Sequence, residues 1–195
     1  MRSLTIFTAA VALAFTALAK PPVPRPAKEF DFVDANGKHT LLSSYRGKVV
    51  VIQFLQTTCP HCQAMSQMLT KLNAELGPRG FQPIGVAFND ATPDMVRNYV
   101  SQFHIGMPVA YAPRDTVISY LGLSIMDRFV VPQVMVIDKK GTIVAQSDPL
   151  GTAELQTESY LRDMVDKLLK EGATSSSTKK AVRAVATAKK AGSGQ

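Results

Sequence analysis

Tryptophan is absent from the sequence, and only two of its 195 residues are cysteines. Two cysteines are too few for the several bridges of a small disulfide scaffold, and too few for a four-cysteine zinc site. The three histidines, His39, His61 and His104, are scattered along the chain and add no ligand pattern. We therefore expect no bound metal and no dissociable cofactor.

Acidic residues are absent from residues 172–195, which hold five lysines and arginines. Residues 20–171 are nearly neutral, so this tail carries most of the net charge of +7, and nothing indicates a nucleic-acid-binding domain. The tail is rich in Ala, Ser and Thr and cannot bury enough apolar surface to offset its ordering entropy. We predict a disordered basic tail, with electrostatic contact to anionic envelope components as its hypothetical role.

No apolar run reaches the roughly 20 residues that a membrane-spanning helix needs. The longest one, residues 4–18, follows the basic start Met1-Arg2-Ser3 and ends in the small-residue sequence Ala17-Leu18-Ala19. This layout predicts a signal peptide over residues 1–19 and a mature chain that begins at Lys20 and is periplasmic or secreted. An uncleaved N-terminal membrane anchor is the alternative, and no cysteine follows the cleavage site to accept a lipid.

Strand and helix signals alternate after a proline-rich stretch over residues 20–27, which we expect to be a linker. Val49–Leu55 is apolar on both faces, as in a buried parallel strand, and Cys62–Leu76 has apolar residues at helical spacing. The expected order β-β-α-β-α-β-α-β-β-α predicts one α/β domain over residues 28–171, with a mixed sheet between helices. The other expected strands are 29–34, 83–88, 108–111, 133–138 and 142–146, and the other helices are 93–103, 115–121 and one from Thr152 or Thr157 to Gly172.

Cys59 and Cys62 stand where the strand 49–55 gives way to the helix. A bridge that closes so small a loop adds little stability, so redox chemistry explains the pair better than a structural role. The N-terminus of a helix stabilises a thiolate, and Cys59 at the mouth of the helix should receive most of this effect. We expect Cys62, one turn further in, to be more buried and to keep its proton.

The two residues between the cysteines also suit thiol chemistry. Pro60 has no N–H to lose in the first helical turn. His61, when protonated, adds a positive charge beside Cys59, which favours the reduced form and makes the disulfide more oxidising. The pattern predicts thiol–disulfide exchange through a mixed disulfide. A Cu(I)-binding metallochaperone that uses both cysteines, with His61 or Met65 as a further ligand, is an alternative from another class.

A proline at the start of a strand supplies a second signal. Val131-Pro132 precedes the expected strand 133–138. If the bond between these residues is cis, the backbone of Val131 is exposed for strand-like pairing with a substrate segment. A trans proline at a sheet edge is the alternative.

These residues resemble the exported thioredoxin-like proteins of the TlpA/ResA type, within the redoxin superfamily. The resemblance is carried by Cys59 to Cys62, Val131-Pro132, the turn at Asn36-Gly37 and the turn at residues 137–141. It implies a thioredoxin-like fold and an envelope oxidoreductase that exchanges disulfides with protein thiols. It also implies that Cys59 is the nucleophile, Cys62 the resolving thiol and Pro132 a cis proline, with a membrane redox partner.

Three positions depart from that family. Thr58 stands where a Trp usually precedes the first cysteine, Gln53 replaces a buried Asp of thioredoxins, and Met65 replaces a Glu of some reducing members. The dipeptide Pro60-His61 instead resembles that of DsbA-type oxidases. The sequence therefore leaves open whether the protein reduces, oxidises or isomerises disulfides.

Peroxiredoxins share much of this scaffold, so a peroxiredoxin-like peroxidase is a further alternative. Their motif needs a proline three residues before a threonine that precedes the cysteine. With Cys59 aligned, Phe54 or Leu55 occupies that position here.

Overall fold

The computed structural model describes residues 20–171, so the predicted signal peptide and basic tail lie outside the described residues. The strands are β1 (Arg25–Pro26), β2 (Asp31–Asp34), β3 (His39–Leu41), β4 (Val49–Leu55), β5 (Phe81–Ala87), β6 (Val109–Tyr111), β7 (Gln133–Ile137) and β8 (Thr142–Gln146). The helices are α1 (Pro60–Leu76), α2 (Pro93–Gln102), α3 (Arg114–Leu121) and a last helix over residues 158–171, with 3-10 turns at Leu42–Tyr45, Gly77–Arg79 and Glu154–Gln156. Within the described part of the chain, no helix is long and apolar enough to cross a bilayer.

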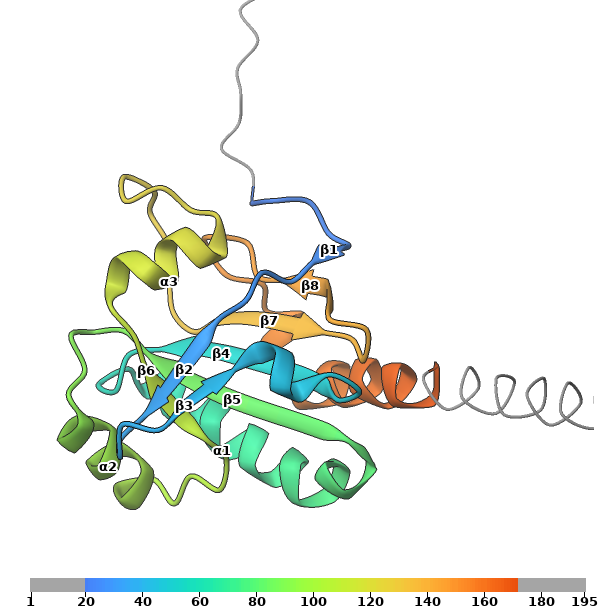
Figure 1. The fold of residues 1–195 in the computed structure, drawn as a ribbon, viewed down its shortest axis with the longest axis horizontal. Helices are drawn as coiled ribbons and strands as arrows, with labels where there is room; N and C mark the ends of the chain where they lie inside the picture. The colour runs from blue at the N-terminus through green and yellow to red at the C-terminus, as the bar shows by residue number, and fades with distance from the viewer. Residues whose placement is uncertain (1–19, 172–195) are drawn as a thin grey trace, which may run out of the picture.

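The eight strands of the described chain form one mixed sheet in the order β1-β8-β7-β4-β5-β6-β2-β3 (Figure 1). The neighbours β4, β5 and β6 run parallel, whereas β7 lies antiparallel to β4. Every residue of β4 is buried, as expected for a central strand covered on both faces. The predicted α/β fold with a mixed sheet between helices is confirmed.

Two apolar clusters cover the two faces of the sheet. Side chains of α1, α2 and the last helix pack on one face, with Leu69, Leu72 and Leu161 fully buried. Side chains of α3 and of the hairpin β2–β3 pack on the other face, and Figure 1 shows this hairpin crossing in front of β4 and β5. Burial of each large apolar side chain contributes about 1.5–3 kcal/mol, so the sheet forms a rigid platform for the residues at its ends.

Residues 20–27 differ from the linker that the sequence predicts, because they lie against the domain. Arg25 stands opposite Ile143 in the pairing of β1 with β8, and the Lys20 ammonium lies 2.7 Å from a carboxylate oxygen of Asp148. Prolines are tolerated at such a sheet edge, since an edge strand needs hydrogen bonds on one side alone. The N-terminal segment therefore closes the β8 edge of the sheet.

Candidate active site

Cys59 is the N-cap residue of α1, and the three-residue turn 56–58 connects it to the end of β4. The backbone N–H of Cys62 donates to the Cys59 sulfur at 3.2 Å, and Pro60 is the first residue of the helix. A sulfur in this position receives both the hydrogen bond and the positive end of the helix dipole. Cys59 is half-buried, so a partner sulfur can reach it.

Cys62 lies in different surroundings, although it is one helical turn away. Its side chain is fully buried, and both cysteines are free thiols. Burial raises the pKa of the Cys62 thiol far above its usual range, and the Cys59 sulfur beside it adds to this effect. The expected contrast in burial between a half-buried Cys59 and an enclosed Cys62 is confirmed.

Three hydrogen bonds hold the turn that presents Cys59. The N–H of Thr57 donates to the side-chain oxygen of Asn89 at 3.2 Å, and the Asn89 amide donates back to the Thr57 hydroxyl at 3.1 Å. The Gln63 amide of α1 donates to the Thr57 carbonyl at 3.1 Å. Sequence reasoning missed Asn89, whose signal was its place just after β5, the parallel neighbour of β4.

A neutral polar cluster of Gln53, Ser66 and Tyr99 lies beneath Cys62. The Gln53 amide donates to the Cys62 carbonyl at 2.8 Å, and the Ser66 hydroxyl donates to the Gln53 oxygen at 2.7 Å. The Tyr99 hydroxyl lies 2.7 Å from the Ser66 hydroxyl and 3.2 Å from the Cys62 carbonyl. Burial raises the pKa of Tyr99 to about 12, so the cluster holds no charge at neutral pH. It joins β4, α1 and α2 around the backbone of Cys62.

The Val131–Pro132 peptide bond is cis, which confirms the expectation from the sequence, and the trans alternative is wrong. The Val131 carbonyl faces the Cys59 sulfur at 3.9 Å. The Val130 N–H donates to the Pro149 carbonyl at 2.9 Å, whereas the Val131 N–H has no hydrogen-bond partner within residues 20–171. The backbone of Val131 is therefore free to pair with another chain beside the reacting sulfur.

His61 is exposed on the first turn of α1. Its ring makes no hydrogen bond or ion pair with residues 20–171, so its predicted effect on the Cys59 thiolate remains a prediction. Within the same described range, no three His, Cys, Asp or Glu side chains lie close enough together to hold a metal ion.

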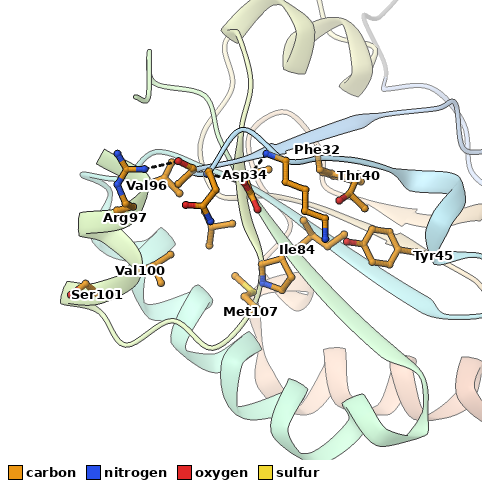
Figure 2. A pocket seen from close by; sticks show the side chains of 16 residues that line it. Phe32, Asp34, Thr40, Tyr45, Ile84, Val96, Arg97, Val100, Ser101 and Met107 are labelled. Atoms are coloured by element: carbon orange, nitrogen blue, oxygen red, sulfur yellow. Dashed lines mark hydrogen bonds between the residues drawn. The ribbon is translucent and has the colours of Figure 1, made fainter. Parts of the chain in front are cut away.

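A separate pocket of about 450 Å³ lies beneath the β2–β3 hairpin, beside α2 (Figure 2). Phe32, Ile84 and Met107 form part of its apolar wall, and Arg97 of α2 lies at its edge. Arg97 is already engaged, because it donates to Asp94 at 2.6 Å and to the Ala35 carbonyl. Neither cysteine lines this pocket, so it is not part of the dithiol site.

Comparisons with known proteins agree with this arrangement. A thiol-disulfide oxidoreductase ResA of Bacillus thuringiensis subsp. konkukian is 28% identical over 148 residues, which cover 76% of this chain and 82% of the relative. The crystal structure of a thioredoxin-family thiol:disulfide interchange protein from Chlorobium tepidum TLS matches with a TM-score of 0.63 and 25% identity, over 76% of this chain and 99% of that one. A thiol:disulfide interchange protein from Bacteroides sp. matches with a TM-score of 0.62 and 19% identity, over 76% and 91% of the two chains.

These structures confirm the thioredoxin-like fold that the resemblance implied. The profile of the AhpC/TSA family matches residues 23–146, a range that includes both cysteines and the cis proline. This match spans more than half of the sequence. The chain belongs to the AhpC/TSA family of redoxins.

Proposed function

We propose that Cys59 and Cys62 exchange disulfides with protein thiols, with Cys59 as the nucleophile and Cys62 as the resolving thiol. The chain is a thiol–disulfide oxidoreductase by its family and its relatives. One observation carries the assignment of roles: the Cys59 sulfur caps α1 and is accessible, while Cys62 is buried behind it as a thiol.

The exchange proceeds in two balanced steps. The Cys59 thiolate attacks one sulfur of a substrate disulfide, whose S–S bond breaks as the departing substrate thiolate takes up a proton. The product is a mixed disulfide between Cys59 and the substrate. Cys62 then loses its proton and attacks the Cys59 sulfur, which closes the intramolecular disulfide and releases the second substrate thiol. The substrate is reduced by two electrons and the dithiol is oxidised, and the reverse sequence oxidises a substrate dithiol.

The backbone of Val131 supports the encounter. A substrate segment that lies in an extended conformation can hydrogen-bond to the N–H and the carbonyl of Val131, as an added strand does. This pairing would bring a substrate sulfur beside Cys59, because the Val131 carbonyl lies 3.9 Å from the Cys59 sulfur.

Trapping of the intermediate tests the two roles. In Cys62→Ser the second step is blocked, so a disulfide-bonded substrate protein should accumulate as a covalent adduct on Cys59. Cys59→Ser should form no adduct, and its exchange rate should fall by about 10³-fold or more, as is typical when a nucleophile is removed. Adducts of equal yield on Cys62 in the Cys59→Ser protein would reverse the assignment.

We also propose that the protein works outside the cytoplasm and exchanges electrons with a membrane redox partner. The sequence of residues 1–19, which has the layout of a signal peptide, supports the location. N-terminal sequencing of the exported protein tests it, with Lys20 as the expected first residue. The five basic residues of the segment 172–195 support contact with anionic envelope components. Deletion of residues 173–195 should weaken binding to anionic vesicles, and unchanged binding would refute this role for the tail.

A further inference from the structure

A groove of about 550 Å³ adjoins the dithiol. Its lining comprises Gln56, Arg114, Asp127, Arg128, Phe129, Val130, Val131 and Leu150. Two of these residues also touch the site, because the Cys59 N–H donates to the Gln56 carbonyl at 3.1 Å and the Val131 carbonyl faces the Cys59 sulfur. The groove, called here the Val131 groove, is thus continuous with the place where a substrate sulfur reacts.

Exposed apolar side chains gather on the two loops that form the groove. Met126 is 85% exposed and Ile125 is 65% exposed on the loop after α3, and Leu150 is 72% exposed on the loop after β8. The Val130 N–H donates to the Pro149 carbonyl, which ties the two loops together. Apolar residues left in water beside a reactive site mark a surface that binds a partner.

Two cations line the same groove. Arg114 and Arg128 are exposed, and neither makes an ion pair within residues 20–171. The Arg114 guanidinium lies 5.5 Å above the ring of Phe129, which in turn stacks on Phe88 at 6.1 Å. Arg114 is thus held in place before any partner arrives.

The acid of the groove is already engaged. A carboxylate oxygen of Asp127 accepts the backbone N–H of Ser124 at 2.6 Å. The lining still holds two arginines and one aspartate, so its balance of charge is positive and the groove is complementary to negative charge.

We propose that the Val131 groove binds an extended segment of the substrate protein in which an acidic residue and an apolar residue stand close to the reacting cysteine. This inference rests on the proposed function and adds a substrate preference to it. In an extended segment that pairs with Val131, successive side chains point to opposite sides of the strand. The acidic one meets Arg114 and Arg128, and the apolar one packs against Leu150 and Val130.

Cysteine peptides that differ at one position test the preference. Each peptide carries one cysteine, with Glu, Gln or Lys two residues away, and is mixed with the oxidised full-length protein. The measured quantity is the rate constant with which the peptide thiolate opens the Cys59–Cys62 disulfide, forming a mixed disulfide with Cys59 and releasing the Cys62 thiol. The Glu peptide should react about fivefold faster than the Gln peptide at low salt, and the Lys peptide more slowly than both, the scale of an exposed ion pair. The difference should shrink at 0.5 M salt, because exposed charges are screened (roughly 4 Å Debye length).

Charge reversal in the groove supplies the decisive variant. The double substitution Arg114→Glu with Arg128→Glu should reverse the order, so that the Lys peptide reacts fastest. Lys38→Glu with Lys140→Glu makes the same change in net charge on the β2–β3 turn and the β7–β8 turn, and should keep the wild-type order. Leu150→Ser should slow peptides with an apolar neighbour and leave those without one unchanged.

Dithiothreitol, a small dithiol that does not fill the groove, separates the two levels of the proposal. It attacks as a thiolate, so it is compared at about 0.5 M salt, where exposed charges are screened, and it should then reduce the wild-type and both charge variants at nearly equal rates. If it reduces all three equally but the groove variant keeps the preference for Glu, the groove assignment is wrong and the dithiol assignment stands. If the oxidised protein contains no disulfide that dithiothreitol can reduce, both are wrong.

Discussion

At the scale of single residues, the two sulfurs of the dithiol are made unequal by one turn of helix. Cys59 accepts a backbone N–H at the start of α1, whereas Cys62 is enclosed above a cluster that carries no charge. The sequence predicted this contrast, because the position of a residue along a helix determines both how strongly the helix dipole acts on it and how deeply it is buried. It did not predict the hydrogen-bond partners of Tyr99, because helical spacing shows which side chains face the core but not what their polar groups contact.

The protonation of Cys62 predicts a steep pH dependence of ring closure. Burial holds its pKa above the usual range, so its thiolate fraction increases about tenfold per pH unit between pH 7 and 9. Tyr99 and Cys59 are the titratable groups that interact with it, and Tyr99, with a pKa of about 12, stays neutral in this range. In a mixed disulfide of Cys59 with nitrothiobenzoate, attack by Cys62 releases the chromophore. The rate of this release, followed by stopped flow, should rise about tenfold per pH unit. A flat profile would mean that another group removes the proton.

Tyr99 should contribute to stability through its hydroxyl. Tyr99→Phe leaves the buried Ser66 hydroxyl without one of its partners, so we expect a loss of about 1–2 kcal/mol in the free energy of unfolding. Tyr160→Phe is the matched control, because the Tyr160 side chain is exposed and should change stability by less than about 0.5 kcal/mol. Urea denaturation measures both, and equal losses would contradict a structural role for the neutral cluster.

At the scale of elements, the sequence predicted the parts that have strong periodicity. The strands 49–55 and 142–146 have the expected bounds, and α1 begins two residues earlier than its apolar pattern because Cys59 and Pro60 start it. The edge strand β1 was missed, since two residues of backbone pairing leave no periodic signal. The Val131 groove could not be predicted either, because it forms where loops distant in sequence meet.

The packing of the N-terminal segment gives a prediction for Gly122. This residue has φ of 72°, and a Cβ there would collide with Pro21, so Gly122→Ala should cost the left-handed backbone penalty of about 1–2 kcal/mol and more for the collision. Gly37→Ala is the control, because Gly37 has φ of 76° with open space around it. The midpoint temperature of thermal unfolding should be lower for Gly122→Ala than for Gly37→Ala. Equal midpoints would contradict the packing of residues 20–27 on the domain.

At the scale of the whole molecule, a nearly neutral domain places one dithiol at the end of its central strand. The sheet is buried on both faces, so α1 and the cis-proline loop are held by packing from the two apolar clusters. Fold and site position follow from strand order and could be inferred from the sequence. The direction of electron flow could not, because it depends on the energy difference between dithiol and disulfide, to which many weak effects contribute.

The reduction potential of the full-length protein tests the central claim most directly. Equilibration with glutathione buffers should give one two-electron transition that involves Cys59 and Cys62, at a potential between about −270 mV for a reductant and about −120 mV for a strong oxidant. Alkylation followed by mass analysis identifies the bonded residues at each ratio. If no intramolecular disulfide between Cys59 and Cys62 forms at any glutathione ratio, the account is wrong.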